Sequence, residues 1–291
     1  MIGGTRKPLD VFRRYPTLAG SVLIGCAFIG VSIYTIVCIP LSEAIVLWTG
    51  PTEVWRNTPR LAQPAWTNFF RREKLPETRI IPLQTADKAT EQLGDALWRK
   101  TATLSFEYPY MHLPSEINLF LEVEYDTLHP QLTLAWLRPD GKELEIFRGT
   151  PGRSTRFAIS KEIGLDEAYG GIPEGRALTG EYALRIEAFA FEEKFSMSGR
   201  LVIYGRVHGI AGTDNLRRDL LIGLLWGMPI GLAFGLLATI GTTLLGFTLA
   251  ALGSWFGGWG DAAIQRLTEV NMMLPLLPIL IMVGKFYSSS I

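Results

Sequence analysis

Cysteine and histidine are scarce in this chain of 291 residues, which contains two cysteines and three histidines. Cys26 and Cys38 lie in one apolar run, where a helix would separate them by about 18 Å, too far for a disulfide. His112, His129 and His208 lack the spacing of helical zinc ligands. The motifs G-x-S-x-G, S-x-x-K, G-x-G-x-x-G and G-x-x-x-x-G-K-[ST] are also missing. We therefore predict that the chain is not an enzyme and holds no metal or cofactor of its own.

Net charge is missing as well, because 28 basic residues balance 28 acidic ones. This balance argues against a nucleic-acid partner, which would require a basic excess or stripe. Charged residues are absent from positions 17–39 and 220–252, whereas the stretch between them is mixed and polar. The composition predicts a membrane protein that carries an inserted water-exposed domain.

Three apolar segments are candidates for membrane helices: residues 17–39, about 220–252 and about 267–286. About 20 apolar residues span a bilayer. The first segment exceeds the core of about 7 to 15 residues in a cleaved signal peptide, so we expect it to remain as a helix.

Basic residues before the first segment set the expected orientation. They are Arg6, Lys7, Arg13 and Arg14, opposed by Asp10. Positive residues favour the cytoplasm, which predicts a multi-pass membrane protein with a cytoplasmic N-terminus. Residues from about 50 to 215 would then be extracytoplasmic and the 253–266 loop cytoplasmic. Arginines on the expected outer side weaken the rule: Arg56, Arg60, Arg217 and Arg218.

Alternation of apolar and polar residues from Thr101 onward predicts strands at 119–126, 131–147, 181–191 and 199–207. Pro139, Asp140 and Gly141 form a hairpin signal within the second of these segments. About seven short strands imply an all-β antiparallel sandwich. Residues 160–180 contain several glycines, and we expect a loop there with one helical turn.

An acidic row on the first of these segments has two interpretations. Glu122, Glu124 and Asp126 could form a metal site or an acid–base pair, but their alternation with Leu121, Val123 and Tyr125 favours a solvated strand face.

These patterns divide the chain into four parts. They are residues 1–48 (N-terminus and first helix), 49–100 (connector), 101–208 (sandwich) and 209–291 (membrane part). The connector has no regular period and is rich in proline and tryptophan, so we expect short helical turns. Trp48 just before it, and Trp55 and Trp66 within it, could lie at the membrane interface or pack on the following domain.

Glycines recur every four residues in the second apolar segment, at Gly223, Gly227, Gly231 and Gly235, and the stripe of small residues continues to Gly246. Helices in lipid associate through close backbone approach, which small residues allow. The stripe predicts close helix packing, in a transporter core or in any other bundle. Pro229, Pro275 and Pro278 should bend their helices.

Two spaced motifs flank this helix. Gly-Thr-Asp-x-Leu-x-Arg-Asp covers 212–219, and Gly-Gly-Trp-x-Asp-x4-Arg-x2-Glu-x5-Pro covers 257–275. With Gly227 between them, they resemble the permease subunits of ATP-binding-cassette (ABC) importers for dipeptides, oligopeptides and nickel. The residues that carry the resemblance are Gly212, Thr213, Asp214, Arg218, Asp219, Gly227, Gly257, Gly258, Asp261, Arg266, Glu269 and Pro275. The family commonly has Asp at Glu269, and often Ala-Arg-Ile-Ser where this chain has residues 228–231, which leaves the role of the missing arginine open. A continuous helix over 261–275 would pair Arg266 with Glu269.

The resemblance implies an α-helical protein of the inner membrane with six helices, of which this chain holds three, with the sandwich inserted outside. It implies a second permease subunit, two cytoplasmic ABC ATPases that hydrolyse ATP, an extracytoplasmic substrate-binding protein and the lipid bilayer as partners. The chain ends before the cytoplasmic loop that would contact the ATPase, so we expect a C-terminally truncated permease. The alternative is a membrane-anchored β-sandwich that binds or senses a ligand. A membrane enzyme is a third and weaker alternative.

Overall fold

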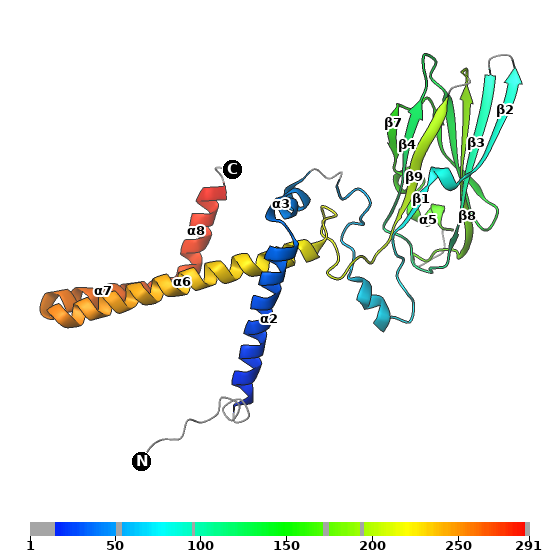
Figure 1. Ribbon diagram of the computed structural model, residues 1–291. Coiled ribbons are helices and arrows are strands. Elements are labelled where there is room, and N and C mark those ends of the chain that lie inside the picture. Colours follow the sequence, from blue (N-terminus) through cyan, green and yellow to red (C-terminus); the bar gives the residue numbers. More distant parts are fainter. Residues whose placement is uncertain (1–14, 51–53, 95–96, 171–174, 193–194, 289–291) are drawn as a thin grey trace. The chain divides into compact units, whose positions relative to one another are not determined.

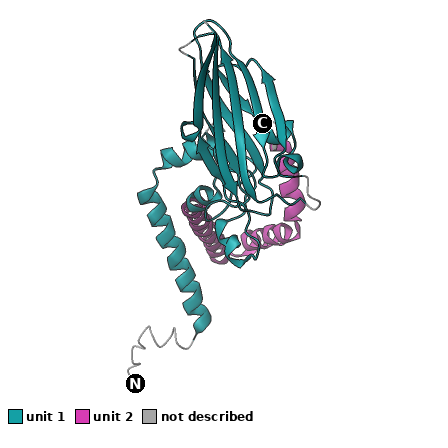
Figure 2. Ribbon diagram, turned by 90° about the vertical axis from the view of Figure 1, so that its right-hand side faces the viewer, with its two compact units in different colours: residues 1–226 teal, residues 227–291 magenta. Residues whose placement is uncertain are grey.

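The computed structural model describes residues 15–50, 54–94, 97–170, 175–192 and 195–288 (Figure 1). The basic residues that set the expected orientation lie outside these ranges. The chain divides into two compact units, residues 1–226 and 227–291 (Figure 2).

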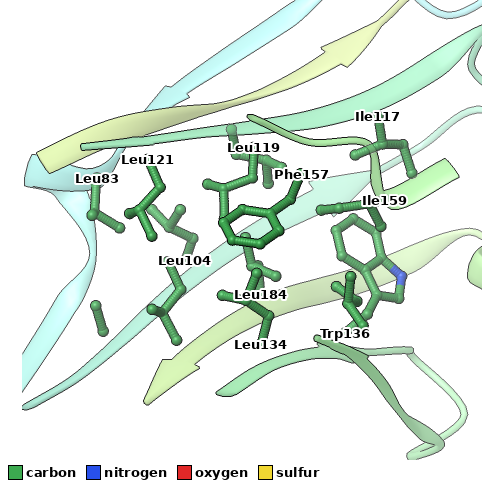
Figure 3. Close-up of a cluster of buried hydrophobic side chains, with 14 of the residues drawn as sticks. Leu83, Leu104, Ile117, Leu119, Leu121, Leu134, Trp136, Phe157, Ile159 and Leu184 are labelled. Atoms are coloured by element: carbon green, nitrogen blue, oxygen red, sulfur yellow. The ribbon is translucent and has the colours of Figure 1, made fainter. Parts of the chain in front are cut away.

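The first unit contains two antiparallel sheets within its described residues. Their strand orders are β1-β9-β4-β7 and β2-β3-β8-β5-β6. The strands are β1 (Arg79–Pro82), β2 (Asp87–Gly94), β3 (Leu97–Tyr108), β4 (Glu116–Glu124), β5 (Gln131–Leu137), β6 (Glu143–Gly149), β7 (Ser154–Phe157), β8 (Gly180–Ala190) and β9 (Ser196–Tyr204). The two sheets enclose one apolar core, so the predicted antiparallel sandwich is confirmed (Figure 3).

The core forms because alternate residues of strands such as β4 and β8 point inward. On β4, Leu119, Leu121 and Val123 are buried, while Glu122 and Glu124 are exposed. The acidic row is thus the solvated face of a strand, as the alternation predicted. Trp136 on β5 is fully buried, and its indole N–H donates to the carbonyl of Ala168 at 2.9 Å.

The sequence pattern did not predict strands β1 and β2. All eight residues of β2 are exposed, so no buried face imposes a period on it. β1 has only four residues and ends in a proline. Strands therefore begin at Arg79, well before the alternation that starts at Thr101.

The hairpin expected at Pro139 to Gly141 is present between β5 and β6. Gly141 has a φ of +82°, which favours glycine, and Arg138 and Lys142 close the turn through a backbone hydrogen bond of 3.0 Å. The stretch 160–180 contains two helical turns where one was expected, α4 (Ile159–Glu162) and α5 (Leu165–Ala168). Positions 171–174 of that stretch lie outside the described residues.

Two helices precede the sandwich, α2 (Pro16–Cys38) and α3 (Leu41–Thr49). Pro40 lies between them and has an extended backbone, which ends the first apolar helix. The connector also contains two 3-10 turns, η1 (Ala65–Phe70) and η2 (Leu83–Thr85). The sequence did not predict α3, because Pro40 interrupts the apolar run.

Helix α6 (Leu220–Phe256) has 37 residues, begins in the first unit and continues into the second. At 1.5 Å per residue it is about 55 Å long, which exceeds the hydrocarbon thickness of a bilayer. It and α2 are long and apolar enough to cross a membrane.

The second unit ends in α7 (Gly258–Met273) and α8 (Leu276–Ser288), which meet at an angle of 75° and together could form a third span. The expected helix over 267–286 is therefore divided. Leu274 takes an extended conformation before Pro275, since the proline ring disfavours a helical residue before it.

Candidate functional site

The segment that leads from β9 into α6 is bound to the connector. We define the junction as residues 54–68 of the connector and 205–219 of this segment. Backbone hydrogen bonds join Gln63 to Arg206 and to His208 at 2.8 Å, and Ala65 to Gly209 at 2.8 Å. The first motif of the sequence lies at the end of this ladder, so its residues are held in place by a partner segment about 150 positions earlier.

Thr213 is a buried residue of the junction, with 4% of its surface exposed. Its hydroxyl donates to the carbonyl of Pro59 at 2.9 Å and accepts from the N–H of Ala62 at 3.0 Å. Its own N–H donates to the carbonyl of Ala62 at 3.0 Å. One side chain thus satisfies a buried donor and a buried acceptor of the connector.

Asp214 organises the turn before the helix. Its carboxylate accepts from the backbone N–H groups of Leu216 and Arg218 at 2.8 and 2.9 Å, and from the Arg218 guanidinium at 2.7 Å. Burial raises the pKa of Asp214, but these hydrogen bonds outweigh it and hold the pKa below its usual value. The carboxylate therefore stays charged and holds Arg218 in place.

Arg218 connects the motif to helix α3. Its guanidinium lies 4.2 Å from the centre of the Trp48 ring and donates to the Trp48 carbonyl at 3.1 Å. Trp48 also covers Gly223, where a Cβ would lie 2.6 Å from the ring. Trp48 thus packs on the start of α6, and its location at the membrane interface stays a prediction. Trp66 likewise donates to the carbonyl of Ile210 at 3.0 Å.

Arg217 was not identified from the sequence, because it occupies an unspecified position of the motif. Its φ is +70°, and its side chain is only 5% exposed. The guanidinium donates to the carbonyl of Thr58 at 2.6 Å and to the carboxylate of Glu116, and it lies 4.3 Å from the centre of the Tyr204 ring. A positive φ is uncommon for a residue other than glycine. Here it lets the Arg217 side chain contact the connector just before α6 begins.

Gly212 and Asp219 complete the junction. Gly212 has a φ of +78°, and a Cβ there would lie 2.4 Å from the carbonyl oxygen of Ala62, so only glycine fits. Asp219 accepts from the N–H of Leu221 at 2.9 Å and caps the start of α6. The structure therefore gives Gly212, Thr213, Asp214, Arg218 and Asp219 structural contacts within the junction, and their role in a permease stays a prediction.

The second motif lies in the other unit. Gly257 and Gly258 have φ values of +57° and +58° and form the turn between α6 and α7. Asp261 lies beside Gly253, where a Cβ would be 3.2 Å from the carboxylate. Arg266 and Glu269 form the expected ion pair at 2.7 Å.

The glycine stripe is uncovered along most of α6. Added Cβ atoms at Gly227, Gly231, Gly235 and Gly246 would meet nothing within 4 Å. Only Gly223 and Gly253 have close neighbours among the described residues. Close packing of this stripe against another helix stays a prediction.

No group of three or more His, Cys, Asp or Glu side chains within the described ranges could hold a metal ion. The junction offers buried hydrogen bonds and ion pairs, which hold the sandwich on the helix that follows it. The fold and the junction define a membrane protein with two or three apolar spans and a β-sandwich inserted before the long helix.

Part of the chain is similar to permease subunits of transport systems. It is 40% identical over 73 residues to the peptidoglycan transport system permease protein YejE of Agrobacterium fabrum, covering 25% of this chain and 19% of that protein. It is 34% identical to the glutathione transport system permease protein GsiD of Pectobacterium atrosepticum and 30% identical to the dipeptide transport system permease protein DppC of Alkalihalophilus pseudofirmus, in each case over 64 residues that cover 22% of this chain and 21% of the relative.

The chain therefore spans about a fifth of the length of the curated relatives it matches. Over the matched stretch, the resemblance to importer permeases is confirmed. No model of a protein family matches the chain.

Solved structures resemble this chain only distantly. TmCBM61 in complex with beta-1,4-galactotriose is 10% identical, with a TM-score of 0.22, and covers 52% of this chain and all of that one. The infectious bursal disease virus Gx strain structure is 17% identical, with a TM-score of 0.26, and covers 47% of this chain and 34% of that one. At these scores the assignment of a sandwich depends on the strand order and the core described above.

Proposed function

We propose that this chain is a permease subunit of an ABC importer and that its helices form part of the translocation path. The observation that carries the proposal is the 40% identity to a transport permease over 73 residues. The apolar helices α2 and α6 support it, since both are long enough to cross a membrane. ATP hydrolysis would take place on separate subunits.

Peptides are the cargo class that we propose. The three relatives are named for peptidoglycan, glutathione and dipeptide transport, and each of these compounds contains amide-linked amino acids. A second permease subunit, two ABC ATPases and an extracytoplasmic substrate-binding protein would complete the importer. The uncovered glycines of α6 support close approach by helices of the partner permease.

The proposed location is the inner membrane, with residues from about 50 to 215 on the extracytoplasmic side. In that arrangement the sandwich faces the binding protein and the junction lies between the sandwich and the membrane. Arg217 and Arg218 hold the start of α6 through buried or partly buried contacts. Through these contacts, a displacement of the sandwich by a bound partner would move the first turn of α6.

The test is purification of the tagged full chain from membranes of its native host in a mild detergent, with the associated proteins identified by mass spectrometry. We expect a second permease and an ABC ATPase pair. The variant Gly231→Leu is compared with wild type. It places a bulky side chain on the uncovered stripe and should reduce the recovery of the second permease. A wild-type chain that reaches the membrane but is recovered alone would refute the importer proposal.

A further inference from the structure

A pocket of about 310 Å³ lies over the outer face of the sheet that contains β4, β7 and β9. The proposed transport function assigns no role to this pocket. Phe120 points away from the core on β4, since its neighbours Leu119 and Leu121 are buried. In the strand register, Arg156 on β7 and Arg200 on β9 flank it. The two guanidinium carbons lie 5.9 and 5.4 Å from the centre of the Phe120 ring.

The connector and the junction bring further arginines to the same place. Arg56 lies 5.2 Å from the centre of the Phe120 ring, so that three guanidinium groups surround one aromatic ring. Arg60 and Arg217 also line the pocket. These arginines come from β7, β9, the connector and the segment that precedes α6. The positive charges therefore converge from several directions.

The negative charge within the described part of the pocket is smaller. Glu116 accepts from Arg217 and lies 3.7 Å from Arg60 and 3.8 Å from Arg156, so one carboxylate contacts three arginines. Glu122 is the acidic residue that lines the pocket itself. Four guanidinium groups and one carboxylate therefore line the pocket, and Glu116 beside it pairs with three of those four arginines. A concave surface with an excess of one charge attracts ions of the opposite charge.

The chemistry of the lining selects among anions. Guanidinium groups donate paired hydrogen bonds that match phosphate and carboxylate oxygens. A planar carboxylate is satisfied by one or two such groups, whereas a tetrahedral phosphate exposes oxygens in several directions and carries up to two charges. We propose that this pocket binds a phosphate group.

Two sources could supply that group. Arg217 lies three residues before Leu220, where the apolar helix α6 begins, and phospholipid headgroups extend several ångströms beyond the hydrocarbon core. A phosphate group at that depth belongs to an anionic lipid headgroup or to a soluble phosphate.

The experiment measures binding of inorganic phosphate to the detergent-purified full chain by titration calorimetry, with acetate as the carboxylate reference. We expect saturable binding that is tighter for phosphate than for acetate. The variant Arg156→Gln should weaken phosphate binding by about tenfold, which corresponds to the loss of one charge-assisted hydrogen bond. The matched control is Arg148→Gln, which removes an exposed arginine on β6 and should leave the binding unchanged.

The source is resolved by native mass spectrometry of the same proteins after reconstitution in vesicles of phosphatidylcholine with added phosphatidylglycerol. Loss of retained phosphatidylglycerol in Arg156→Gln but not in Arg148→Gln supports the pocket with a lipid headgroup as its source. Equal lipid retention with weakened inorganic phosphate binding supports it with a soluble source. Equal behaviour of wild type and Arg156→Gln towards both ligands, or acetate binding as tight as phosphate binding, overturns the proposal. Thermal unfolding of each variant excludes misfolding as the cause.

Discussion

At the scale of single residues, this protein depends on a few polar side chains that each complete several hydrogen bonds. The Thr213 hydroxyl bonds to one carbonyl and one N–H group of the connector, and the Asp214 carboxylate bonds to the Arg218 guanidinium. A buried polar group left without its partner is more costly than the bond itself is favourable. Small changes at such residues should therefore have measurable effects.

Replacing Thr213 tests this directly. Thr213→Val keeps the shape of the side chain but leaves the Ala62 N–H and the Pro59 carbonyl without the hydroxyl, at a cost of about 1–3 kcal/mol. Thr213→Ser keeps the hydroxyl and should lose much less stability. Limited proteolysis of the connector in the purified full chain measures the difference. Equal cleavage rates for the two variants would contradict this role for the hydroxyl.

Glu192 gives a prediction about pH. Its carboxylate accepts from the Thr127 hydroxyl and from the N–H groups of residues 126–128, and these bonds lower its pKa from 4.5 to about 2. Because the folded pKa is depressed, the contribution to stability is complete above the unfolded value of 4.5 and is lost as the pH falls towards 2.

We therefore expect Glu192→Gln to unfold at a lower temperature than wild type at neutral pH. The gap between the two melting temperatures should close between pH 4.5 and pH 2. The measurement is circular dichroism of the sandwich in the detergent-solubilised chain. A gap that is independent of pH would show that the carboxylate charge contributes nothing.

At the scale of elements, Trp48 at the end of α3 packs against the start of α6 in the first unit. Trp48 covers Gly223 so closely that even a methyl group would displace the ring. Gly227, four residues along the same stripe, has open space around it. The two glycines share a pattern in the sequence but differ in their surroundings.

The pair provides a matched test. Gly223→Ala should move Trp48 and weaken its contact with Arg218, which would appear as a shift in tryptophan fluorescence and faster proteolysis near residue 49. Gly227→Ala should change neither in the purified chain and should stabilise the helix slightly, by up to about 1 kcal/mol, because alanine favours a helix. If Gly227→Ala caused the larger disturbance, the assignment of Trp48 to Gly223 would be incorrect.

At the scale of the whole molecule, the central question is the side of the membrane on which the sandwich lies. The proposed orientation places Lys88, exposed on β2, outside and Gln265, exposed on α7, inside. Single cysteines at these positions, with Cys26 and Cys38 replaced by serine, report this orientation.

We expect a membrane-impermeant maleimide to label Lys88→Cys in cells whose outer membrane is permeable, and to label Gln265→Cys only after lysis. The two variants are controls for each other, since each reports the opposite side. Labelling of Gln265→Cys alone before lysis would reverse the proposed orientation.

Much of the architecture could be predicted from local sequence. Strands with one buried face, such as β4 and β8, follow the two-residue period, and the apolar runs of α2 and α6 exceed the length of a bilayer span. The strand β2 could not be predicted, because neither of its faces is buried. The sequence predicted a bend at Pro275, but it did not predict the angle of 75° between α7 and α8.

The sequence by itself determined the apolar helices, the alternating strands and the two spaced motifs, because each is set by residues near one another in the chain. Only the tertiary structure showed that Thr213 and Arg217 bind a connector about 150 positions away, and that arginines from three segments surround Phe120. The reason is physical: hydrogen bonds and charge pairs between distant segments impose no period on the sequence. The block of residues that resembles a permease is legible as a motif, whereas its attachment to the sandwich is a property of the fold.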